Sequence, residues 1–218
     1  MIDLHEIGNL CNQYYAIFHS DTVQTVGHFP FDLKNIPVHF ITGAAHKFHG
    51  PKGAGILYIH ESIKIKPFVH GGAQERNMRA GTENLYGVVG FAKALELAIT
   101  HLETDRAHIL SLKSYLMQRL QELGDVRFNG DADGACLYTV LNVSFPRTET
   151  TEMLLMNLDM KGICVSGGSA CSSGADMGSH VIRAVAPGVD RVPIRFSFCK
   201  HNTNAELDQL VETLKDSL

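Results

Sequence analysis

The 218-residue sequence has no tryptophan, no long apolar run and no cluster of basic residues. Its 19 Lys and Arg residues stand against 23 Asp and Glu residues, a formal net charge of −4, so we expect no direct binding of nucleic acid and no attraction to anionic membranes. No stretch of about 18 apolar residues occurs, so we predict no membrane-spanning helix. The start, from Met1 to Glu6, lacks the basic and apolar regions of a secretory signal, and we expect none.

Cysteines are few, odd in number and scattered, and no two form a Cys-x-x-Cys pair; they are Cys11, Cys136, Cys164, Cys171 and Cys199. This pattern disfavours both a disulfide framework and a zinc ribbon, so a reduced, cytoplasmic setting is the default expectation. Among 12 histidines only His46 and His49 have the spacing of neighbouring metal ligands, and no third ligand stands beside them.

The apolar pattern predicts a chain of helices and strands with an ordinary globular composition, 44% hydrophobic and 19% charged. In the first half we expect a helix over residues 3–15, strands at 16–20, 38–42 and 55–59, and long helices over 83–102 and 105–123. In the second half we expect a strand over 137–145, a helix over 151–161, a short strand at 163–165, a strand over 192–198 and a last helix with a capping box, Thr203 to Glu206. The fold class is therefore α/β, and the second half is typical of a small α+β domain.

Two polar groups follow predicted strands of the first half, where parallel sheets place their ligands. Lys47 lies between such a strand and a Gly-Pro turn, where partial burial would free its amine for covalent chemistry. Without further evidence, Lys47 is more often an ordinary surface lysine than a reactive one. Asp21 follows the first strand and could pair with a pyridinium nitrogen, or it could simply cap a helix.

Three further segments carry candidate residues. The run from Ser166 to Gly174 is rich in serine and glycine, and it places Cys171 in what reads as an exposed loop, which favours a reactive thiol over a structural one. A Gly-rich stretch leads to Thr82 at the predicted start of a helix, a plausible anion site or a plain helix cap. Arg195 alternates with apolar residues on a strand and could meet a carboxylate or face solvent.

Together these segments resemble the NifS/IscS-like cysteine desulfurases, pyridoxal-phosphate enzymes within the class V aminotransferases. The motifs are His46-Lys47 before Gly-Pro-Lys-Gly, the Arg-x-Gly-Thr-Glu-Asn segment from Arg79, and Ser-Ala-Cys-Ser-Ser around Cys171, in family order. The resemblance implies the remnant of a fold type I large domain with a mainly parallel sheet over residues 1–104. It further implies a small C-terminal α+β domain over 105–218, which carries the catalytic cysteine loop.

The resemblance also implies a role for each matching residue. Lys47 would hold pyridoxal 5′-phosphate as a Schiff base and later move protons. Asp21 would pair with the pyridinium nitrogen, Gln24 with the ring's phenolic oxygen, and His46 with the phosphate. Thr82 would reach the phosphate of a neighbouring subunit in a homodimer.

Arg195 would bind the carboxylate of the L-cysteine substrate, and Cys171 would take its sulfur as a persulfide while alanine leaves. The sulfur would pass to an acceptor or scaffold protein, for iron–sulfur cluster assembly or tRNA thiolation. The same resemblance allows Cys171 to share an iron–sulfur ligand role with a partner.

The sequence departs from the family pattern in three places. It begins just before the strand of Asp21, without the portion that in the family holds a ring-stacking histidine, a phosphate loop and an asparagine near the substrate. Ala44 stands where a serine usually binds the phosphate, a loss of roughly 1.5–3 kcal/mol of cofactor binding. Ala73 replaces a common glycine.

Three hypotheses follow. The first is a desulfurase segment that carries the lysine and the cysteine but not the whole cofactor pocket. The second is a cofactor-free sulfur-relay or interaction module that keeps Cys171 without turnover of its own. The third is another class V enzyme acting on a different amino acid, against which the Cys171 loop argues.

Overall fold

The computed structural model describes residues 1–167, 179–185 and 190–218. These divide into two compact units, Met1–Leu102 (unit 1) and Glu103–Leu218 (unit 2). The boundary predicted from sequence lies two residues further along the chain. The functions assigned above to the two parts stay predictions.

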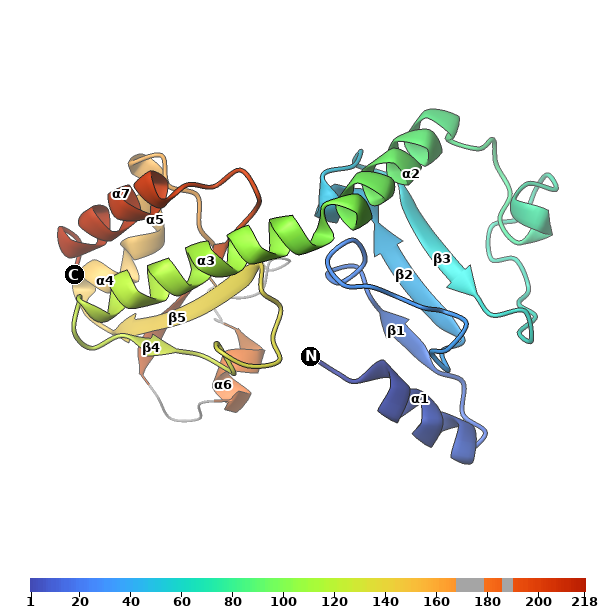
Figure 1. Cartoon of the computed structure of the whole chain (residues 1–218), viewed down its shortest axis with the longest axis horizontal. Helices are drawn as coiled ribbons and strands as arrows, with labels where there is room; N and C mark the ends of the chain where they lie inside the picture. Colours follow the sequence, from blue (N-terminus) through green and yellow to red (C-terminus); the bar gives the residue numbers. More distant parts are fainter. Residues whose placement is uncertain (168–178, 186–189) are drawn as a thin grey trace. The chain divides into compact units, whose positions relative to one another are not determined.

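Unit 1 is built on a three-stranded sheet in the order β1-β2-β3, formed by His19–Asp21, Phe40–Ala44 and Gly55–Ile59 (Figure 1). β1 and β2 run parallel, whereas β2 and β3 run antiparallel. The α/β class is thereby confirmed, but the described sheet has one pair of each kind and is not mainly parallel. Around it lie helix α1 (Leu4–Gln13), helix α2 (Leu85–Thr100) and two short 3-10 helices, η1 (Ala45–Phe48) and η2 (Glu75–Asn77).

The third strand matches its predicted range, but the first begins three residues later than predicted. Ile17, which was expected in a buried strand, is 64% exposed. The reason is the end of α1, where Tyr15 has a positive φ of 52° and the Ala16 amide donates to the Cys11 carbonyl. The chain is still closing the helix at residue 16 and only then enters the sheet.

Helix α2 buries a different face from the one its leucines and valines predicted. Leu85, Val88 and Val89 are all more than half exposed, whereas Phe91 is buried and packs with Phe48 of η1 at a ring-centroid distance of 5.2 Å. Two glycines of α2 lie where a side chain would meet a neighbouring residue. A Cβ on Gly90 would meet Pro51 at 3.0 Å, and one on Gly87 would collide with the side chain of Asn84.

Unit 2 is built on an antiparallel sheet in the order β4-β5-β6, formed by Arg127–Phe128, Val140–Pro146 and Arg191–Ser197. Helices α3 (Leu102–Gln121) and α7 (Asn204–Lys215) lie beside each other, since Tyr115 donates to Asp208 at 2.7 Å. The stripe predicted for α3 is buried, with Leu112, Leu116 and Leu120 at most 2% exposed. The predicted capping box of α7 is confirmed: Thr203 and Glu206 cap each other's backbone.

Two predictions for unit 2 were wrong, and one helix was missed. The helix expected over 151–161 is two helices, α4 (Glu149–Glu152) and α5 (Leu154–Met160), which meet at Met153. Residues 163–165 form no strand, and only Ser166 makes an isolated bridge, to Arg195. Helix α6 (His180–Val185) was not predicted.

Within the described ranges, no single helix is both long and apolar enough to cross a membrane. The bent pair of α2 and α3 meets that test together, by length and composition only.

Candidate functional site

Asp21 lies at the carboxyl end of β1, directly opposite Thr42 of β2. Its Oδ1 atom accepts from the Val23 amide at 3.0 Å and from Thr42 Oγ1 at 3.4 Å. Thr22 beside it is buried and donates to the Thr42 carbonyl at 2.6 Å. The two strand ends are therefore tied together, and the exposed carboxylate is held in a defined position. Its second oxygen, Oδ2, accepts no bond from the described residues.

Lys47 follows β2 in η1, at the same end of the sheet as Asp21 because β1 and β2 are parallel. Its side chain is half-buried, and among the described residues its Nζ makes no hydrogen bond or ion pair. The side chain of His46 is exposed beside it. The Lys47 carbonyl, in contrast, lies 3.0 Å from the His28 ring Nε2. The backbone at the lysine is thus anchored while the amine is left available.

The short helix η1 is fixed by its apolar residues. Ala45 and Phe48 are buried in a cluster with Val26 and Phe91. His49 then reverses the chain with a left-handed φ of 65°, and the Gly50 amide donates back to the Ala45 carbonyl at 2.8 Å. Residues on both sides of His46 and Lys47 are therefore held in the core, which directs the intervening pair outward.

Gln24 and Thr82 are both exposed in unit 1. Gln24 lies in a turn closed by the Thr25 and Val26 amides, which donate to the Thr22 carbonyl. Thr82 was a candidate helix cap, but the cap of α2 is Asn84, whose Oδ1 accepts from the Gly87 amide at 3.1 Å. The capping interpretation of Thr82 was therefore wrong.

The strand position of Arg195 in unit 2 places it between buried Ile194 and Phe196. Its Nε atom is buried and has no hydrogen-bond partner among the described residues. Its backbone makes two hydrogen bonds with Ser166, at 2.7 and 3.2 Å. Ser166 opens the segment that carries Cys171. This cysteine, with its predicted catalytic and iron–sulfur roles, lies outside the described residues, but the start of its segment is bonded to the arginine strand.

Three contacts of the candidate residues were not predicted from the sequence. They join Thr42 with Asp21, His28 with Lys47, and Ser166 with Arg195. Each joins residues at least 19 positions apart. Local spacing carries no signal for such pairs, and only the strand register would have revealed them.

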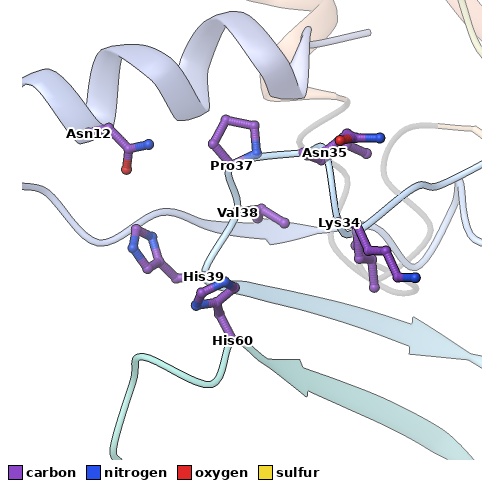
Figure 2. Close-up of a pocket in the computed structure, with 9 residues that line it drawn as sticks. Asn12, Lys34, Asn35, Pro37, Val38, His39 and His60 are labelled. Atoms are coloured by element: carbon purple, nitrogen blue, oxygen red, sulfur yellow. The ribbon is translucent and has the colours of Figure 1, made fainter.

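Unit 1 also has a surface hollow, lined among others by Asn12, Pro37, Val38, His39 and His60 (Figure 2). His39 precedes β2 and His60 follows the antiparallel β3, so the hollow lies at the opposite end of the sheet from Asp21 and Lys47. The His39 ring is held there by the Phe18 amide, which donates to its Nδ1 at 3.0 Å. The hollow is therefore separate from the predicted cofactor residues.

Within the described residues, no group of three or more His, Cys, Asp or Glu side chains is placed to hold a metal ion.

Similarity to known proteins identifies the family of this chain. The class V aminotransferase family model matches residues 1–210. The chain belongs to this family. Cysteine desulfurase IscS of Dictyoglomus turgidum is 38% identical over 215 residues, covering 97% of this chain and 54% of the relative. Cysteine desulfurase 1 of Trichormus variabilis is 39% identical over 216 residues, covering 98% of this chain and 54% of its own length.

Solved structures agree with this class V assignment. A NifS-like protein from Rickettsia africae superposes with a TM-score of 0.86 at 29% identity, covering 98% of this chain and 56% of that one. A second NifS-like protein gives the same TM-score at 34% identity, with 98% and 56% coverage. The chain thus spans about half the length of the relatives it matches.

Proposed function

We propose that this chain supplies the lysine and cysteine parts of a pyridoxal-phosphate-dependent cysteine desulfurase, which takes sulfur from L-cysteine and leaves alanine. The observation that carries the proposal is the placement of Asp21 and Lys47 at one end of a parallel strand pair, with the Lys47 amine unbonded within the described residues. The family membership and the desulfurase names of the relatives support it.

The residues of unit 1 fit the cofactor chemically. Asp21 offers a free carboxylate oxygen to a protonated ring nitrogen, Lys47 an amine to the aldehyde, and His46 a ring donor to the phosphate. Gln24 would reach the phenolic oxygen, and Thr82 would meet the phosphate of a second subunit in a homodimer. When bound, the cofactor supplies an electron sink for the substrate's carbon skeleton.

The chain's own residues then bind substrate and collect sulfur. Arg195, whose buried Nε has no hydrogen-bond partner in the described part of the chain, would pair with the carboxylate of L-cysteine. Lys47 would carry protons to and from the substrate carbon. The Cys171 thiolate would attack the substrate sulfur, and the new persulfide would pass to an acceptor or scaffold protein. A reduced, cytoplasmic setting that keeps this thiol free belongs to the same proposal.

The test is the visible absorption spectrum of the purified chain after addition of pyridoxal phosphate. We expect a band from covalently held cofactor in the parent and in Lys52→Ala, an exposed lysine of the same turn, and its loss in Lys47→Ala. An equal band in Lys47→Ala would contradict the role of Lys47. Turnover follows, with alanine and sulfide measured from L-cysteine in the parent and in Cys171→Ala.

The competing function is the cofactor-free sulfur relay, which Ala44 favours because the family usually has a phosphate-binding serine there. It predicts no cofactor band in the parent and a persulfide on Cys171 after incubation with a separate active desulfurase. The two functions are therefore separated by the same two measurements.

A further inference from the structure

Unit 2 contains a lysine–cysteine pair that the proposed desulfurase chemistry does not use. Lys113 of α3 is only 3% exposed, and it is the one charged residue among the buried residues that the structure describes. Its Nζ lies 3.1 Å from Sγ of Cys136. Cys136 itself is half-buried.

The buried amine has an unusual partner. Burying an ammonium group is costly unless an anion or several acceptors replace its water. Within the described parts of the chain, no carboxylate lies within ion-pair distance of Lys113, and Cys136 Sγ is its hydrogen-bond partner. The Cys136 sulfur is held on its other side by the Ala132 carbonyl, to which the thiol donates at 3.5 Å, so its place beside the buried amine is fixed by two contacts.

The loop that carries Cys136 is held against α3. Asp131 accepts from the Ala135 amide at 3.1 Å, and the Cys136 amide donates to the Gly134 carbonyl at 2.8 Å, which closes a tight turn. A Cβ on Gly134 would collide with the Asp131 carboxylate, so a larger residue there would displace this side chain from the Ala135 amide. Just beyond it, the buried Tyr138 ring lies 5.9 Å from the Arg106 guanidinium, one of the earlier residues of α3.

Arg106 and Lys113 are seven residues apart and therefore lie on one face of α3. The loop meets this face at both positions, through Tyr138 and through Cys136. The closed turn and the contact of Tyr138 with Arg106 therefore hold the loop on the helix independently of the contact between nitrogen and sulfur.

We propose that Lys113 and Cys136 form a covalent modification site, at which a hydroperoxide converts the close contact into a sulfur–nitrogen bond. The Cys136 thiolate attacks the peroxide, the O–O bond breaks, and the sulfur becomes a sulfenic acid. The Lys113 ammonium gives its proton to the departing hydroxide, which leaves as water. The neutral amine then attacks the sulfur, the S–O bond breaks, and a second water leaves.

The balance is one thiol, one amine and one hydrogen peroxide giving one sulfenamide and two waters. Sulfur is oxidised by two electrons and the peroxide is reduced by two. Excess thiol reverses the step by attacking the sulfur and releasing the amine. This site involves neither Cys171 nor the cofactor. Its test therefore gives the same answer whether or not the chain is part of a desulfurase.

The experiment treats the full-length chain with hydrogen peroxide, blocks free thiols and maps the tryptic peptides by mass spectrometry. We expect a linked pair of peptides containing Lys113 and Cys136, lighter than their sum by two hydrogen atoms, and cleavage by trypsin after Lys113 should be lost. Dithiothreitol should release both peptides unchanged.

One variant and one internal comparison make the test specific. In Lys113→Met, which keeps an unbranched side chain one atom shorter and removes the amine, Cys136 should react with the sulfenic-acid reagent dimedone and form no linked pair. Its oxidation should slow about tenfold. Cys199, which is also half-buried, serves as the reference thiol in every sample.

The proposal is overturned if parent chain treated with peroxide yields Cys136 sulfenic or sulfinic acid without the linked pair. It is also overturned if Cys136 oxidises no faster than Cys199. Both results are read from the parent chain, so they hold even if Lys113→Met fails to fold. Circular dichroism of each variant shows whether its result can be compared with that of the parent.

Discussion

At the scale of single residues, the clearest pH-sensitive contact is that of Asp125 with Arg191. The Arg191 side chain is 7% exposed, and its guanidinium donates to the Asp125 carboxylate at 2.9 Å and to the Ser144 carbonyl at 2.7 Å. The hydrogen bond from Arg191 lowers the pKa of Asp125, and the positive charge of the guanidinium adds to the effect. A carboxyl with a lowered pKa stabilises the folded state above its unfolded pKa, and this contribution is lost as the pH falls through the folded pKa.

We therefore predict that Asp125→Asn lowers the urea midpoint at neutral pH. The difference from the parent should shrink toward zero as the solution is acidified, because the parent's carboxylate is then protonated too. Asp133→Asn, an exposed aspartate of the same unit, should follow the parent at every pH. A gap between Asp125→Asn and the parent that stayed constant down to acid pH would disprove the electrostatic role.

At the scale of elements, the N-terminus of α7 depends on its capping box. Thr203 accepts from the Glu206 amide, and Glu206 accepts from the Thr203 amide at 2.8 Å, which lowers the pKa of Glu206. Helix α7, which begins at this cap, buries Leu207, Leu210, Val211 and Leu214 in the core of unit 2. Loss of the cap should therefore destabilise the packing of the whole unit and not only the first turn.

We predict that Thr203→Ala lowers the free energy of unfolding by about 1 kcal/mol, as measured by urea denaturation. Thr203→Ser keeps an oxygen at the same position and should stay close to the parent. Equal losses in the two variants would mean that the threonine methyl group, rather than its hydroxyl, supports the helix.

At the scale of the whole molecule, the two units differ in how much they bury. The largest fully buried side chains, from Leu112 to Leu214, all belong to unit 2. Unit 1 instead exposes apolar residues along its strand β3 and helix α2, including Leu57 at 50% and Tyr86 at 91%. Hydrophobic burial is the main favourable term in folding, so unit 2 should be the more stable part of the chain.

Hydrogen exchange followed by mass spectrometry in rising urea tests this order. Amides of β2 and α2 should lose protection at lower urea than amides of α3, β5 and α7. Simultaneous loss in both units would mean that the chain unfolds as one cooperative body, and the division into two units would then have no thermodynamic counterpart.

Much of the fold was accessible from sequence because it depends on neighbours along the chain. The spacing of Leu112, Leu116 and Leu120 predicted the buried face of α3, and the Thr203 and Glu206 pair predicted the start of α7. These signals are local, since helical period and capping act within a few residues. The same reasoning failed for the first turns of α2, where Leu85, Val88 and Val89 are more than half exposed, although Leu95 packs against the buried cluster of unit 1.

The sequence by itself determined the residue types available for chemistry, among them Lys47, Asp21 and Arg195, and the local elements that carry them. Only the tertiary structure decided which groups meet. Strand register placed Asp21 against Thr42, a bridge tied Ser166 to Arg195, and the packing of a loop on α3 brought Cys136 to Lys113. Such contacts join residues about 20 or more positions apart, and their geometry follows from sheet pairing and core packing rather than from the spacing of residues along the chain.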